Sequence, residues 1–125
     1  MDETFLGERE LDVMGVLWAS GSGTVTEVRD QLHDELAYTT VLTVLRNLEA
    51  KGFVRHESEG KAHRYYPRVA QRAARQRAIT RLIERLFGGS AEQLVAHLVE
   101  ERALTEEHLQ RIGKEVSATR DRSRR

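Results

Sequence analysis

One segment, Leu36 to Pro67, narrows the possible folds more than any other part of the chain. Apolar side chains recur every three or four positions over residues 38–51, which predicts an amphipathic helix. Residues 53–57 and 62–66 alternate between apolar and polar side chains, which predicts two strands. The residues between them, Ser58 to Lys61, include a glycine and predict the turn of a hairpin, and the only proline ends the second strand.

The residues before this segment predict two further helices. An apolar stripe with helical spacing runs through residues 6–18, and a glycine- and serine-rich turn at 20–23 ends it. Thr24 and Glu27 have the spacing of a capping box, so a second helix is expected from there to about His33. The first stripe consists of Leu11, Met14, Leu17 and Trp18. Three helices followed by a hairpin predict a mainly α fold with a small β-hairpin, organised as an N-terminal winged helix-turn-helix.

The expected helix over residues 38–51 has two chemically different faces. Its core face consists of Val41, Val44, Leu45 and Leu48. Its outward face consists of Thr39, Thr40, Leu42, Thr43, Arg46 and Asn47. A solvated helix face ordinarily collects Glu and Lys, whereas hydroxyl, amide and guanidinium groups can contact base edges in a major groove. We therefore assign the outward face to base readout, against the alternative of a merely exposed helix.

Charge is unevenly distributed along the chain, although its formal net charge is zero. Residues 1–37 carry two basic and nine acidic groups, whereas residues 38–77 carry nine basic and three acidic groups. Phosphates respond to a local positive patch rather than to the total charge, so this pattern favours double-stranded DNA as the partner. The alternative is that the oppositely charged segments pair within the fold. The residues assigned to phosphate and wing contacts are Tyr38, Lys51, Lys61, His63 and Arg64.

Beyond Pro67 the pattern changes to helices alone. A long helix is expected to Phe87, a break at Gly88 to Ser90, then a shorter helix and a last one that opens near Thr105. The domains expected are a winged domain over 1–68, a helical dimerisation domain over 69–117 and a disordered Arg-rich tail over 118–125.

The apolar faces of the C-terminal helices are too few and too narrow to be buried within one chain, so a homodimer is expected. The alternative is that they fold back onto the winged domain. The residues assigned to the dimer interface are Ile79, Leu82, Ile83, Leu86, Leu94, Leu98, Leu109 and Ile112.

Several function classes lack any supporting motif. The chain has no cysteine, and its five histidines have no metal-ligand spacing, so neither a metal site nor a cofactor is expected. No nucleophile elbow, phosphate-binding loop or paired-carboxylate motif occurs, so no catalytic residue is assigned and the protein is not expected to be an enzyme. Neither a membrane span nor a signal peptide is apparent, so we expect a cytoplasmic protein without membrane insertion.

With these motifs identified, the chain resembles the penicillinase-repressor (BlaI/MecI/CopY) family of winged helix-turn-helix transcriptional regulators. The matching segments are Leu6–Trp18, Thr24–Leu32, Ala37–Val54 and Gly60–Pro67, with a looser match at Leu94–Ile112. The resemblance implies a homodimeric repressor whose winged domains read a palindromic operator and whose C-terminal helices form the dimer.

The same resemblance implies how repression could be relieved. In the best-known members, a membrane metallopeptidase sensor triggers cleavage within the dimerisation region. The corresponding bond here is His97–Leu98, where those members have an Asn–Phe pair. The copper-responsive branch has a C-terminal cysteine motif, and its absence here excludes copper sensing through thiolates.

Two other functions stay open at this point. One is a DNA-binding regulator whose dimer domain binds a small ligand. The other is a winged-helix module for protein–protein interaction, which the basic character of Lys61, His63 and Arg64 disfavours.

Overall fold

The computed structural model describes residues 6–123, which fall into two units divided between Ala78 and Ile79. The first unit contains, in order, α1 (Glu8–Ser20), β1 (Gly23–Thr24), α2 (Val25–Gln31), α3 (Tyr38–Ala50), β2 (Val54–Glu59) and β3 (Ala62–Pro67). Helix α4 (Gln71–Leu86) begins in the first unit and ends in the second, which also contains α5 (Ala91–Glu100) and α6 (Glu106–Ser123). This order confirms the predicted mainly α fold with a small β-hairpin.

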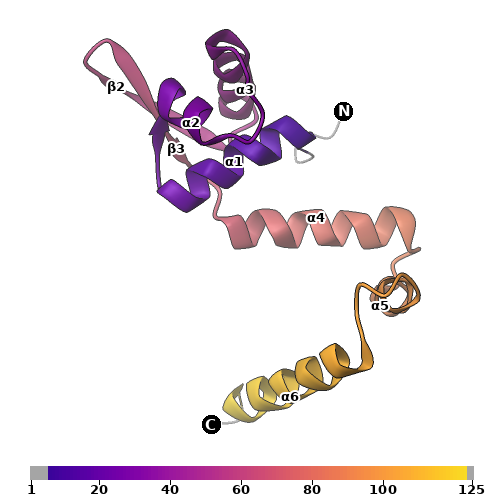
Figure 1. Ribbon diagram of the computed structural model, residues 1–125. Coiled ribbons are helices and arrows are strands. Elements are labelled where there is room, and N and C mark those ends of the chain that lie inside the picture. Colours follow the sequence, from indigo (N-terminus) through magenta and orange to yellow (C-terminus); the bar gives the residue numbers. More distant parts are fainter. Residues whose placement is uncertain (1–5, 124–125) are drawn as a thin grey trace. The chain divides into compact units, whose positions relative to one another are not determined.

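The core of the first unit lies where α1, α2 and α3 meet the base of the β2–β3 hairpin (Figure 1). All four residues of the predicted core face of α3 are buried, as are Tyr65 and Val54 of the hairpin. One prediction for α1 is wrong, because Leu11 is 49% exposed and Val13 is buried in its place. The helix is rotated so that Val13, Met14 and Leu17 face inward, since these three share one side of an α-helix at steps of one and three residues.

The sheet has three antiparallel strands in the order β1-β3-β2. The sequence predicted only the hairpin, because β1 is two residues long and pairs Gly23 and Thr24 with Tyr65 and Arg64, far along the chain. The hairpin strands are longer than predicted, and the turn is reduced to Gly60 and Lys61. Gly60 has φ +63°, which suits the first position of a two-residue hairpin turn.

Helix α3 ends at a glycine, Gly52. Gly52 has φ +85°, and the amide of Phe53 donates to the carbonyl of Leu48 at 2.9 Å, which is the long hydrogen bond of a Schellman motif. Phe53 is buried, so this turn also directs the chain from α3 into β2. The end of the helix and the start of the hairpin are therefore fixed by one local structure.

Replacing Gly52 by alanine is expected to destabilise the first unit by about 1 kcal/mol, because a Cβ is disfavoured at this positive φ. The measurement is the free energy of unfolding in urea. Gly15→Ala is the matched control: Gly15 lies within α1, nothing lies within 4 Å of an added Cβ, and a gain of roughly 0.5–1 kcal/mol is expected there. An unchanged free energy of unfolding in Gly52→Ala would contradict the assignment of Gly52 as a conformational requirement.

The second unit has no core of its own among its described residues. None of residues 79–123 is buried, although many of their large side chains are apolar. The breaks between helices agree with prediction: Gly88 and Gly89 have positive φ, and the Ser90 hydroxyl caps α5 by accepting from the Gln93 amide at 3.1 Å. At the start of α6, the amide of Thr105 donates to the His108 ring, and the Thr105 hydroxyl accepts from the amide of His108.

The C-terminal boundary differs from prediction. Residues 118–123 were expected to be disordered, whereas α6 continues through Ser123. The physical reason is local: Ala118 and the two arginines of this stretch, Arg120 and Arg122, impose little helix penalty. Arg122 also bonds back to Ala118 and Thr119 one turn earlier. Residues 124–125 of the predicted tail lie outside the described residues.

Neither a metal-binding group nor a membrane-spanning helix is found among the described residues. Within residues 6–123, no group of three or more acidic or histidine side chains is arranged to hold a metal ion. Over the same range, no helix combines the length and apolar character needed to cross a membrane.

Candidate nucleic-acid interface

The outward face of α3 carries the side chains that the sequence assigned to base readout. Thr39, Thr43, Arg46 and Asn47 are exposed on it, while the opposite side of the same helix is buried in the core. A helix held on one side only leaves the other side free to enter a groove. No carboxylate among residues 6–123 pairs with Arg46, so its guanidinium is available for a planar, two-bond contact.

Two members of the predicted readout face are less accessible than expected. Leu42 and Thr40 are half-buried, and Leu42 packs against the hydrophobic core. They lie at the edges of the outward arc, where neighbouring elements cover them. Thr43 is exposed, but its hydroxyl donates to the carbonyl of Thr39 at 2.9 Å, which fixes its rotamer and leaves its oxygen lone pairs outward.

The wing consists of β2, β3 and their turn, and its tip projects away from the helices (Figure 1). Lys61 lies in the turn and His63 follows on β3, and both are exposed. The two tyrosines of β3 face opposite sides: Tyr65 is buried and Tyr66 is half-buried. Arg55 lies over the Tyr66 ring at 4.4 Å from its centroid, which adds an exposed cation to the outer face of the wing.

Two of the predicted phosphate contacts are instead committed within the fold. The Arg64 guanidinium pairs with Glu27 at 3.0 Å and Glu59 at 2.9 Å, and it also donates to the Ser22 hydroxyl. The Lys51 ammonium lies 2.8 Å from a Glu10 carboxylate oxygen, which joins the end of α3 to α1. Both side chains are less than a third exposed, and their charged groups are engaged in ion pairs within the first unit.

Tyr38 lies at the start of α3 and is 45% exposed, as a phosphate contact at a helix N-terminus requires. The first turn of α3 contains no acidic side chain, and its cap, Ala37, supplies no side-chain hydrogen bond. The amides of this turn are therefore not occupied by a capping side chain, and an approaching phosphate could accept from them.

Glu27 connects the cap of α2 to the wing. Its carboxylate accepts from the Thr24 amide at 2.8 Å and from Arg64, and the Thr24 hydroxyl accepts from the Glu27 amide, so the predicted capping box is formed. The Thr24 backbone hydrogen bond, followed by the hydrogen bond from Arg64, lowers the pKa of Glu27 below its ordinary value. The wing is thus anchored to the base of α2 by an ionised carboxylate.

Glu27→Gln is expected to lower Tm at pH 7. A carboxylate whose pKa is depressed by folding stabilises the protein above its ordinary pKa of about 4.5 and loses that contribution as pH falls through the folded value. The gap in Tm between wild type and variant should therefore shrink between pH 6 and pH 3. Glu57→Gln, which removes an exposed partner of Arg55, is the matched control and should change Tm little. A gap that stays constant with pH would contradict the role of ionised Glu27.

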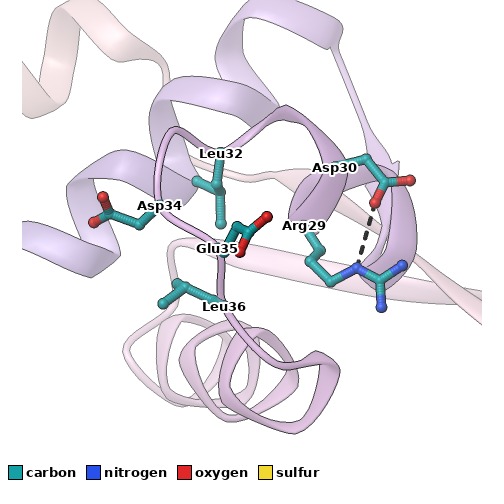
Figure 2. A pocket seen from close by; sticks show the side chains of 6 residues that line it. All are labelled: Arg29, Asp30, Leu32, Asp34, Glu35 and Leu36. Carbon is teal, nitrogen blue, oxygen red and sulfur yellow. Dashed lines mark hydrogen bonds and ion pairs between the residues drawn. The ribbon is translucent and has the colours of Figure 1, made fainter.

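A cavity of about 590 Å³ lies between the end of α2 and the loop that leads to α3 (Figure 2). Its lining consists of Arg29, Asp30, Leu32, Asp34, Glu35 and Leu36. Arg29 and Asp30 form an ion pair at 3.3 Å, drawn as the dashed line in Figure 2, which leaves two further carboxylates in the lining. This negative lining would repel phosphate, so we do not assign the cavity to the candidate nucleic-acid interface.

The residues assigned to dimerisation are placed on the three C-terminal helices with their side chains accessible. Ile79, Leu82, Leu86, Leu109 and Ile112 are 37–72% exposed. Ile83, Leu94 and Leu98 are half-buried. The sequence did not single out Val95, Val99 and Val116, which are exposed on α5 and α6 in the same way.

The His97–Leu98 bond lies inside α5, with His97 exposed and Leu98 half-buried. The carbonyls of both residues accept backbone hydrogen bonds, His97 from Glu101 and Leu98 from Ala103. The bond is therefore held in helical geometry.

The sequence of this chain matches a family model and is similar to known regulatory proteins. The family model described as "Penicillinase repressor" matches residues 6–118. The "Transcriptional regulator BlaI" of Mycobacterium tuberculosis is 32% identical over 117 residues, covering 78% of this chain and 85% of that protein. The "Methicillin resistance regulatory protein MecI" of Staphylococcus aureus is 22% identical over 111 residues, covering 86% of this chain and 89% of that protein.

A solved structure resembles the first unit. The solution structure of the DNA-binding domain of the repressor BlaI superposes with a TM-score of 0.51 and 29% sequence identity. It covers 56% of this chain and 88% of that domain.

Proposed function

Because this chain belongs to the penicillinase repressor family of DNA-binding transcriptional repressors, we propose that it binds a palindromic operator as a homodimer. The family consists of repressors and not enzymes. The observation that carries the proposal is that α3 exposes Thr, Arg and Asn side chains on one side while its opposite side is buried in the core. A helix with one buried and one exposed side can present its exposed side to a major groove.

The roles of individual residues follow from their accessibility. Arg46 forks onto a guanine edge, Asn47 pairs with an adenine edge, and Thr39 and Thr43 contact bases or the adjoining backbone. Tyr38 at the helix start and Lys61 in the wing turn contact phosphates. Lys51 and Arg64 act indirectly in this proposal, by holding α3 and the wing in place through their ion pairs.

The homodimer is proposed from the second unit. A unit with no buried residue among 79–123 and with exposed Ile79, Leu86 and Ile112 requires another apolar surface. A second copy of the same chain supplies that surface by symmetry, and a two-fold axis matches a palindromic operator. An open groove of about 400 Å³ along Ile112 and Val116 of α6 forms part of this face rather than a ligand site.

The test is selection of bound duplexes from a random DNA pool, followed by titration of the enriched duplex at several salt concentrations. The expected result is a two-fold symmetric site whose half-sites lie about one helical turn apart, with an affinity that falls steeply as salt rises. Equal affinity for a single half-site would contradict the dimeric reader. Absence of enrichment would favour the protein-interaction module instead.

Relief of repression is proposed to occur by cleavage at His97–Leu98, triggered by a membrane metallopeptidase sensor. Because this bond is helical, α5 must open locally before a protease can bind it in extended form. The measurement is the intact mass of the repressor recovered from cells in which its operator is derepressed. Fragments that end at His97 and begin at Leu98 are expected, and only full-length chain in derepressed cells would contradict the proposal.

A further inference from the structure

A cluster of three ionisable side chains lies at the junction of α3 and the wing, and only one of them, His63, is among the residues assigned to DNA contacts. The His56 Nδ1 atom of β2 lies 2.6 Å from Oε2 of Glu49 in the last turn of α3. The His63 ring of β3 stacks on the His56 ring, with centroids 4.4 Å apart and planes at 16°. We name Glu49, His56 and His63 the junction cluster.

Strand register places both imidazoles on the face of the wing that continues from the core. His56 is opposite Tyr65, and His63 is opposite Ser58. Alternate residues of a strand share a face, so His56 and His63 lie on the same side as buried Tyr65 and Val54. The cluster therefore lies on the side of the hairpin toward α3, whereas Arg55 and Tyr66 occupy the other face.

We propose that the junction cluster positions the wing relative to the DNA-reading helix and couples DNA binding to proton uptake. This inference rests on the proposed DNA-binding function. Glu49 lies three residues after Arg46, one helical turn from the base-reading side chains. The hydrogen bond that Glu49 accepts from His56 of β2 thus joins the proposed base-reading helix to the hairpin that carries Lys61 and His63.

The geometry defines where the proton goes. An ionised carboxylate only accepts, so His56 Nδ1 carries the hydrogen that Glu49 accepts, and the neutral ring has its lone pair on Nε2. Protonation at Nε2 then creates a cation beside Glu49. Protonation of both rings would place two positive charges in a stack whose centroids are 4.4 Å apart, which is electrostatically unfavourable.

The charged groups around the junction cluster favour proton uptake when DNA binds. The two imidazoles face the Glu49 carboxylate of α3 and the Tyr65 ring of β3, whose centroid lies 5.6 Å from that of His56. Arg46 and Tyr38 of α3 lie close enough to act electrostatically on the Tyr65 hydroxyl. Both His56 and Glu49 are about a third exposed, so phosphates near the wing can act on the cationic ring. Histidine changes charge near neutral pH, and a phosphate stabilises the cation, so affinity should rise as pH falls.

The test uses the full chain, a random-sequence duplex and the duplex enriched by selection, at pH 6 and pH 8 with ionic strength held constant. Wild type is expected to bind about three- to ten-fold tighter at pH 6, which corresponds to an average uptake of about a quarter to half a proton over these two pH units. The double variant His56→Gln, His63→Gln should show less than about a two-fold difference. His33→Gln, in the exposed loop after α2, is the matched control and should keep the wild-type pH profile.

The positioning role is separated from the charge by comparing two single variants at pH 8. His56→Gln can still donate to Glu49, whereas His56→Ala cannot, so the alanine variant should bind about two- to five-fold more weakly than the glutamine variant. Equal binding by these two variants would overturn the positioning role. Thermal melts establish that each variant is folded.

A measurement on the unmodified protein complements the variants. Calorimetric titration of the enriched duplex at pH 7, in buffers of different ionisation enthalpy, gives the number of protons taken up. Uptake of about a quarter to half a proton is expected. Specific binding with no proton uptake, or with the same pH profile in the double variant, would overturn this inference and leave the proposed function intact. Failure of wild type to bind either duplex at both pH values would instead overturn the proposed function.

Discussion

Leu98→Asp is expected to convert the repressor from a dimer to a monomer and to weaken binding to a two-fold symmetric operator by about 10²- to 10⁴-fold. Leu98 lies on α5, in a unit where none of the described residues is buried. A carboxylate placed in an apolar interface loses its hydration without gaining a partner. Without the interface, each winged domain binds one half-site alone, and the gain from linking two half-sites disappears.

The measurements are molar mass by sedimentation equilibrium and titration of full and half operators. Leu11→Asp is the matched control, because Leu11 is an exposed leucine of α1 in the first unit, outside the proposed interface. It should leave the dimer intact. A Leu98→Asp protein that is still dimeric would show that the interface lies elsewhere, whereas a monomer that binds the full site as tightly as wild type would overturn the dimeric reader.

Arg46→Ala is expected to reduce affinity for the enriched operator by roughly 1–3 kcal/mol and to relax the preference at one base pair in each half-site. Arg46 is exposed on α3, and no carboxylate among residues 6–123 holds it, in contrast to Arg64. A guanidinium that is free to present two parallel donors matches the O6 and N7 acceptors of guanine. Truncation removes both bonds and leaves the base edge unpaired.

The measurement is binding to the operator and to its single-base variants, compared with a random duplex. Arg46→Lys is the matched control, because it keeps the charge but cannot form the planar fork. It should retain most affinity for random DNA while losing the preference at the same base pair. An equal loss on operator and random DNA in Arg46→Ala would identify Arg46 as a phosphate contact instead.

Helix α3 illustrates what local sequence predicts well. Its four buried positions follow directly from the helical period, and its end follows from Gly52, which has the positive φ that a helix C-terminus favours. The Thr24 and Glu27 capping box is equally local, since its two hydrogen bonds span three residues. These features depend on neighbours a few residues apart, so the order of residues determines them.

The wing illustrates what local sequence does not predict. Strand β1 is too short to have a period, and it becomes a strand only because Gly23 and Thr24 pair with β3. Arg64 was assigned to phosphate because it lies in a basic stretch, but its partners Ser22 and Glu27 lie 42 and 37 residues earlier. Lys51 meets Glu10 across 41 residues in the same way. A charge pattern cannot separate a free cation from one that the fold has paired.

The sequence by itself determined the order of the helices and the hairpin, the core face of α3, and the resemblance to the repressor family, because each is encoded by residues close together in the chain. Only the tertiary structure decided which cations are free. It left Arg46 exposed, paired Arg64 and Lys51 with distant carboxylates, and joined Glu49 to His56 beside His63. The physical reason is that side-chain charge pairing depends on distances in space, which are set when packing of the three helices fixes the position of the wing.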